Sequence, residues 1–253
     1  MGCLQLDHLI ENSLMLRVEW KILDVASKLA GANKLITTES LYRISKQNLA
    51  DSREDISAAI YDLVLKKYIV IGSKITINQV LLNEKRFRIH EYISQNPGCH
   101  LNEIKAFINL KGQLVKWHLA ILEKFDFIFS VPYLKYLAFF PKEFDRTLTV
   151  PYLTLKNVNA NTIFSTLWAN PGLTLSDLRP LIPLDLPTLK YHLQKLVKSK
   201  IIEIQEVNEH SYYFFNSQIL KNLQKPLNLS DEELENLFNY QNEFKETLLY
   251  VPL

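Results

Sequence analysis

Residues 96–119 read NPGCHLNEIKAFINLKGQLVKWHL, and residues 170–193 read NPGLTLSDLRPLIPLDLPTLKYHL. Both stretches open with Asn-Pro-Gly and close with an aromatic residue, His and Leu, at a constant offset of 74 residues. The apolar positions in and around them match at the same offset without a gap, which indicates a duplicated module. The matched positions are Ile89 with Ile163, Ile93 with Leu167, Leu101 with Leu175, Ile104 with Leu178, Leu110 with Leu184, Val115 with Leu189, Leu119 with Leu193, Leu122 with Leu196, and Ile128 with Ile202.

Each copy predicts three helices and a β-hairpin. The first helix ends at Asn-Pro-Gly, because Pro cannot continue a helix and Gly accepts a positive φ. A short second helix follows, and then a third whose inward apolar residues recur at i, i+4 and i+7. The expected helices are 86–95, 101–108 and 112–124 in one copy, and 160–169, 175–182 and 187–199 in the other. The expected strands are Asp126–Val131 with Tyr136–Phe140, and Ile201–Val207 with Ser211–Phe215. This order predicts a winged helix with an internal helix-turn-helix.

A third, degenerate copy is expected at the N-terminal end. Ile56, Ile60, Leu63 and Ile69 match Val115, Leu119, Leu122 and Ile128 at an offset of 59 residues. Its helices are expected at 14–30, 38–46 and 53–67, the last opened by Ser52 with Asp55. A very short hairpin, Ile69–Ile71 with Lys74–Ile77, would close it.

The predicted fold class is therefore mainly α with small β-hairpins (α+β), as three tandem winged-helix domains plus a C-terminal helix. We call residues 1–82, 83–142 and 160–216 the first, second and third modules. Residues 143–159 are expected to be an ordered linker and 217–253 a helical extension. Within that extension Pro226 should break a short helix, and a capping box of Ser230 and Glu233 should open a terminal helix over 231–250.

The spacing from Asn-Pro-Gly to aromatic-His-Leu resembles the winged helix-turn-helix regulators common in archaea, related to the ArsR and MarR groups. The resemblance covers the second and third modules well and the first only loosely. It implies DNA binding and transcriptional regulation. Winged helices also build protein scaffolds, notably the ESCRT-II sorting complex, so the resemblance specifies fold better than function.

The third module offers the better DNA-reading surface. In a helix-turn-helix the recognition helix enters the major groove, and its outward face supplies the contacts. With Leu189, Leu193 and Leu196 inward, the helical period places six polar residues on the outward face of the helix or at the flank of that face. These candidate DNA-binding residues are Thr188, Lys190, Tyr191, Gln194, Lys195 and Lys198. The run Thr188–Lys200 has four lysines and no acidic residue, which suits contact with phosphate.

The equivalent helices of the other modules differ. The second module would turn Leu114, Trp117 and Ile121 outward, an apolar stripe that we expect to be covered by another module or by a partner protein. The first module would turn Asp55 and Asp62 outward, and these carboxylates would repel a phosphate backbone.

Other features predict that one chain binds DNA weakly. The third hairpin carries Glu206 and Glu209, and neither later recognition helix contains Arg, the usual reader of guanine. A dimer would double the contacts, and the apolar stripe of the terminal helix is a candidate dimerisation surface. Packing of that stripe on its own third module is equally consistent with the sequence.

Composition excludes several classes of protein. The chain has 253 residues, 47% of them hydrophobic, and a net charge of +2, which is ordinary globular usage. No apolar run approaches the roughly 20 residues that span a bilayer, so we expect no membrane insertion. Two cysteines, Cys3 and Cys99, favour a cytoplasmic protein without disulfides. No phosphate-binding loop, catalytic motif or paired metal-ligand spacing occurs, so we expect no enzyme activity, cofactor or metal.

Two function hypotheses follow from the sequence. The leading one is a transcriptional regulator that binds double-stranded DNA, with the third module as main reader. The alternative is a winged-helix interaction scaffold of the ESCRT-II type, in which the stripe around Trp117 docks a protein partner.

Overall fold

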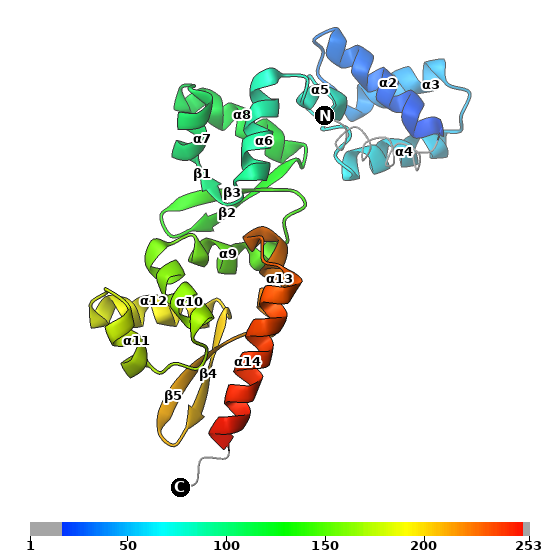
Figure 1. The fold of residues 1–253 in the computed structure, drawn as a ribbon. Coiled ribbons are helices and arrows are strands. Elements are labelled where there is room, and N and C mark those ends of the chain that lie inside the picture. The colour runs from blue at the N-terminus through cyan, green and yellow to red at the C-terminus, as the bar shows by residue number, and fades with distance from the viewer. Residues whose placement is uncertain (1–16, 250–253) are drawn as a thin grey trace. The chain divides into compact units, whose positions relative to one another are not determined.

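The computed structural model describes residues 17–249, so Cys3 and the start of the predicted helix 14–30 lie outside the described residues. The chain forms two compact units, with the boundary between Lys142 and Glu143 (Figure 1). The first unit contains the first and second modules, and the second unit contains the rest of the chain. Among the described residues, no helix is both long and apolar enough to cross a membrane.

The first module is a three-helix bundle. Its helices are α2 (Arg17–Gly31), α3 (Thr38–Asn48) and α4 (Arg53–Leu65). Ser52 caps α4 as predicted, since its hydroxyl accepts the Asp55 N–H at 3.0 Å. The core comes from all three helices and includes Ile22, Leu41 and Ile56, which are fully buried.

The hairpin predicted for the first module is not formed. Residues 66–76 make turns, and a short helix α5 (Ile77–Val80) follows them. The backbone of this segment bonds elsewhere: the Gly72 N–H donates to the Ile36 carbonyl at 2.8 Å, and the Ile36 N–H donates to the Ser73 carbonyl at 2.9 Å. The loop between α2 and α3 therefore takes the hydrogen bonds that a hairpin would have used.

The second module has the predicted order of elements. Its elements are α6 (Glu84–Gln95), β1 (Cys99–His100), α7 (Leu101–Ile108), α8 (Gly112–Lys124), β2 (Ile128–Tyr133) and β3 (Tyr136–Pro141). The strands form an antiparallel sheet in the order β1-β3-β2, with Ser130 opposite Phe139. Strand β1 was not predicted, because two residues are too short to show a period in sequence.

The third module repeats this order. Its elements are α10 (Val158–Ala169), α11 (Leu175–Leu181), α12 (Leu186–Lys198), β4 (Ile202–Val207) and β5 (His210–Phe215). In place of β1, an isolated bridge joins Thr174 to Tyr212. The Asn-Pro-Gly turns also agree in detail, since Gly98 and Gly172 have φ of 70° and 84° and donate to Phe139 and Tyr213 respectively. The positive φ predicted for both glycines is confirmed.

The segment predicted as a linker is helical and joins the core of the second unit. It contains the 3-10 turn η1 (Arg146–Leu148) and helix α9 (Thr149–Leu155). Leu148 and Leu155 are buried with the core of the third module. Pro151 does not interrupt α9 because it lies in the first turn, where a helix does not need its N–H.

Two helices complete the second unit. Helix α13 (Ser217–Leu227) includes Pro226 and ends one residue after it, so the predicted break at Pro226 comes slightly too early. Helix α14 (Asp231–Leu249) follows. The predicted capping box is confirmed, because the Ser230 N–H donates to Glu233 Oε2 at 2.7 Å and the Glu233 N–H donates to Ser230 Oγ at 3.2 Å.

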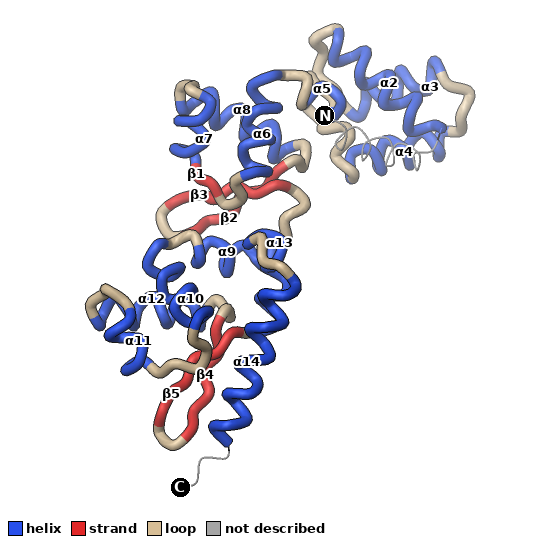
Figure 2. Tube along the Cα trace, viewed as in Figure 1, coloured by secondary structure: helices blue, strands red, loops and turns tan. Residues whose placement is uncertain are grey.

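Helix α14 lies along the β4–β5 hairpin (Figure 2). Gln241 bonds the backbone of Phe215 with both ends of its amide, each at 3.2 Å. Phe244 contacts the rings of Tyr212 and Phe214. The apolar stripe of the terminal helix therefore packs on its own module, and a dimer would have to use another surface of the chain.

Candidate nucleic-acid interface

The local sequence fixes which face of α12 is inward. Asp185 caps the helix by accepting the Thr188 N–H at 3.3 Å, and Pro187 lies in the first turn, where proline is tolerated. Leu189, Leu193 and Leu196 are buried in the core. The opposite face is left to polar side chains.

The six candidate DNA-binding residues lie on the accessible part of α12. Lys190, Tyr191, Gln194 and Lys198 are exposed, and Thr188 and Lys195 are half-buried. Within the described part of the chain, Lys190 and Lys198 form no ion pair. Their charges are thus not neutralised by neighbouring carboxylates.

Tyr191 and Lys195 are coupled one turn apart. The Lys195 ammonium lies 4.6 Å from the centre of the Tyr191 ring. A cation over a tyrosine face is attracted by the ring quadrupole, with an energy of about 0.5–1 kcal/mol at exposed sites. This contact orients the Tyr191 ring and keeps the ammonium of Lys195 on the outer side of the helix.

The first turn of α12 is electrostatically different from the rest. Hydrogen bonds from Thr188 lower the pKa of Asp185, so this carboxylate stays ionised at neutral pH. It would disfavour a phosphate close to Thr188. The cationic part of the interface consists of the middle and the C-terminal turn of α12.

The third hairpin adds no positive charge. Its turn places Asn208 and Glu209 at positive φ, and Glu206 accepts a hydrogen bond from the Ser211 hydroxyl at 2.7 Å. All three acidic residues of this hairpin, Glu203, Glu206 and Glu209, are exposed. Contact with a phosphate backbone would therefore depend on α12.

The equivalent helix of the second module presents an apolar surface. Leu114 and Trp117 are 48% and 53% exposed, and Ile121 is half-buried. Leu114 and Trp117 thus remain largely uncovered in the single chain. The Trp117 ring contacts Arg86, whose guanidinium carbon lies 5.9 Å from the ring centre.

The paired histidines have a structural position. His118 and His192 are both 6% exposed, and burial lowers the pKa of each, with Arg86 and Lys195 adding smaller effects. The Asn159 side-chain amide on α10 donates to His192 Nε2 at 3.3 Å in the tautomer that leaves Nε2 unprotonated, which links α12 to the neighbouring helix. Sequence reasoning missed Asn159, because no pattern connects residues 33 positions apart.

Across residues 17–249, no three His, Cys, Asp or Glu side chains come together as they would around a metal ion.

Comparison with known proteins gives one informative relative. No family model matches the chain. The chain is 36% identical over 143 residues to an uncharacterised HTH-type transcriptional regulator of Methanocaldococcus jannaschii. The match covers 56% of this chain and 36% of that protein, so the chain spans only about a third of the relative's length.

Proposed function

We propose that this chain is a DNA-binding transcriptional regulator in which the second and third modules are winged helices and the third is the main DNA reader. The observation that carries the proposal is the outer face of α12, where Lys190, Gln194 and Lys198 are exposed. No acidic residue occurs from Thr188 to Lys200. The name of the archaeal relative, a transcriptional regulator of helix-turn-helix type, supports the same function.

The residue types suggest a division of roles on this helix. Lysines bind phosphate as compact point charges, so Lys190, Lys195 and Lys198 would hold the duplex in place. Tyr191 and Gln194 carry hydroxyl and amide groups that would reach base edges or phosphates, whereas Thr188, beside Asp185, would contact a base edge. Such an interface gives affinity that depends strongly on salt and specificity that depends on few side chains.

The weakness of a single α12 favours binding as a dimer. Two recognition helices about one turn of the duplex apart would double the phosphate contacts. Since α14 is packed on its own hairpin, the dimer would use a different surface. In this function the chain has no catalytic role and needs no cofactor.

The test is binding to a labelled random-sequence duplex, followed by fluorescence anisotropy across a salt series. We expect a dissociation constant in the micromolar range that rises steeply with salt. The triple variant Lys190→Glu, Lys195→Glu, Lys198→Glu should lose this binding. The matched control is Lys116→Glu with Lys124→Glu, because these two lysines hold the equivalent positions on α8. Unchanged binding by the triple variant, or no wild-type binding at low salt, would exclude α12 as the reader.

A second candidate function is protein docking at Leu114, Trp117 and Ile121. The observation that favours it is the exposed Trp117 beside the exposed Leu114, since aromatic anchors dominate many interfaces. Under this proposal Trp117→Asp would abolish a complex or self-association without changing DNA binding. Size-exclusion chromatography with light scattering on wild type and variant would show whether the face supports assembly.

A further inference from the structure

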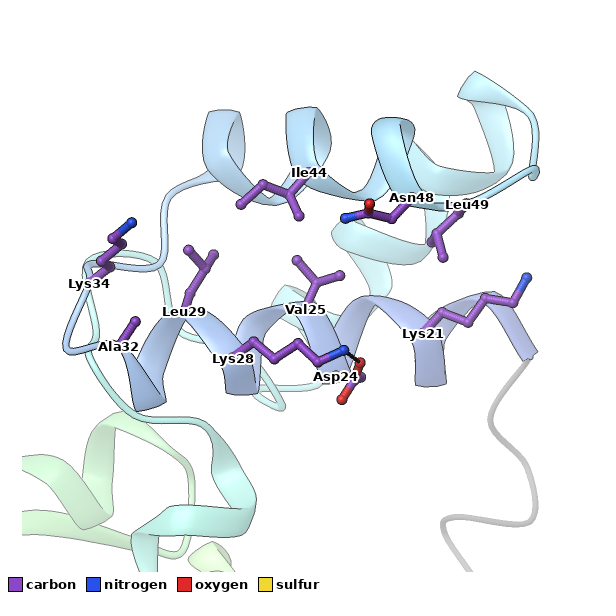
Figure 3. A pocket seen from close by; sticks show the side chains of 10 residues that line it. All are labelled: Lys21, Asp24, Val25, Lys28, Leu29, Ala32, Lys34, Ile44, Asn48 and Leu49. Atoms are coloured by element: carbon purple, nitrogen blue, oxygen red, sulfur yellow. Dashed lines mark ion pairs between the residues drawn. The ribbon is translucent and has the colours of Figure 1, made fainter.

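The first module contains a cavity of about 520 Å³ between α2 and α3. Figure 3 shows Val25 and Leu29 projecting from α2 toward Ile44 of α3, with Leu49 just beyond the end of α3. Val25 and Leu29 belong to the buried core and Ile44 and Leu49 are half-buried against it, so together they form an apolar floor. The volume lies within the roughly 300–1,000 Å³ of sites that bind small molecules.

Positive charge surrounds this apolar floor. Three lysines, Lys21, Lys28 and Lys34, line the cavity together with one carboxylate, Asp24. Lys21 pairs with Asp51 at 2.7 Å, and Lys28 pairs with Asp24 one turn away along α2. Within the described residues Lys34 forms no ion pair, so three lysines face two carboxylates and one positive charge is left over.

The polar groups lie at different places along the cavity. In Figure 3, Lys34 is at the end near Ala32, whereas Asn48 and Lys21 lie toward the other end. The pair between Lys28 and Asp24 is exposed on the outer side of α2, where ion pairs contribute little stability. Lys28 is therefore available to a competing anion, in addition to Lys34.

We propose that this cavity binds an organic monoanion with an apolar body, such as a carboxylic acid with a medium-length hydrocarbon chain. The carboxylate would pair with Lys34, and the hydrocarbon would lie over the apolar floor formed by Val25, Leu29 and Ile44. The single uncompensated charge matches a monoanion better than a neutral or cationic ligand. This site is separate from the residues proposed to read DNA, and it gives the first module a role in ligand sensing.

Binding would stabilise the pairing of α2 with α3. A ligand that contacts both helices binds the folded bundle and not the unfolded chain, so it raises the melting temperature in proportion to its concentration. Ala32 is exposed at the mouth of the cavity, which allows the site to be filled without removing a core side chain.

The test uses the full chain with labelled methyl groups and titration of sodium decanoate, followed by NMR. We expect saturable shifts at the Ile44, Val25 and Leu29 methyl groups, and at least tenfold weaker binding of decanol and of decylamine. Lys34→Glu should weaken decanoate binding at least tenfold. Lys46→Glu is the matched control, since Lys46 is an exposed lysine of α3 that does not line the cavity, and it should bind within twofold of wild type.

A variant that fills the cavity distinguishes binding of decanoate inside it from unspecific attraction of decanoate to surface lysines. Ala32→Trp leaves every charge in place and should abolish the shift at Ile44. Wild-type binding by Ala32→Trp or Lys34→Glu, or shifts confined to Leu114 and Ile121 on α8, would overturn the proposal, as would the absence of any saturable shift. Because no DNA is present, none of these outcomes bears on the function proposed for α12.

Discussion

Trp117 and Tyr191 hold the same position in equivalent helices, α8 and α12, and their side chains are 53% and 52% exposed. Each is followed by a buried His that its ring contacts, His118 and His192. The neighbouring side chains differ. One turn further along, Trp117 is followed by Ile121, whereas Tyr191 is followed by Lys195, whose ammonium lies on its ring. The same backbone frame thus presents an apolar face in one module and a cationic face in the other.

Tyr191→Ala should weaken DNA binding more than Trp117→Ala. The substitution removes a hydroxyl and the ring that orients Lys195, an effect of roughly 0.5–1.5 kcal/mol or about two- to tenfold in affinity. Anisotropy titrations of both variants against one duplex measure the difference. Trp117→Ala should leave the affinity unchanged, and an equal loss in both variants would show that the second module also contacts DNA.

The slope of the salt dependence should report how many lysines of α12 neutralise a phosphate. Each lysine that neutralises a phosphate contributes about 0.9 to the slope of log K against log salt concentration. Lys190→Gln and Lys198→Gln should each reduce the slope by about this amount, whereas Thr188→Val should lower affinity and leave the slope unchanged. Slopes that stay at the wild-type value in both lysine variants would mean that neither side chain lies on a phosphate.

Sequence patterns predicted the helices of all three modules because the apolar residues recur at the helical period over long segments. They also predicted both capping residues, Ser52 and Ser230, because capping chemistry is local. The outward face of α12 followed from the same period, since fixing the inward leucines leaves only one side of the helix for Lys190 and Lys198.

The missed features depend on partners distant in sequence. The hairpin expected in the first module is replaced by two backbone hydrogen bonds, from the Gly72 N–H to the Ile36 carbonyl and from the Ile36 N–H to the Ser73 carbonyl, which no local pattern reveals. The segment around Pro151 has the sequence of a linker, but in the structure its Leu148 and Leu155 are buried in the core of the second unit. The cavity of the first module combines Lys34 from a loop with Ile44 from α3, so only the folded bundle brings them together.

Stability should fall between neutral and mildly acidic pH because of His118 and His192. Burial lowers the pKa of both in the folded chain, whereas in the unfolded chain each titrates near its ordinary value of about 6.5. As pH falls below about 6.5, the unfolded chain takes up protons that the folded chain does not, so the free energy of unfolding decreases. The stabilisation is present above this pH and is lost progressively below it.

The measurement is the melting temperature at pH 7.5 and pH 5.0. The variant His118→Leu with His192→Leu should show a smaller difference between the two pH values than wild type, because neither position then titrates. A variant that retains the full wild-type difference would assign the pH dependence to other groups.

Gln241 should be a major determinant of how α14 holds the β4–β5 hairpin. Its side chain is 1% exposed, and its amide accepts the Phe215 N–H and donates to the Phe215 carbonyl. Gln241→Ala leaves both backbone groups buried and unpaired, at a cost of about 1–3 kcal/mol each, so we expect the free energy of unfolding to fall by roughly 2–6 kcal/mol. Gln241→Leu fills the volume and still leaves both groups unpaired, so it should be destabilised to a similar extent and thereby exclude a pure cavity effect.

The control is Asn239→Ala, at an exposed position on the same helix, which should change the free energy of unfolding by less than about 0.5 kcal/mol. Urea denaturation of the three variants measures these free energies of unfolding. A Gln241→Leu protein as stable as wild type would show that the two hydrogen bonds do not anchor the helix.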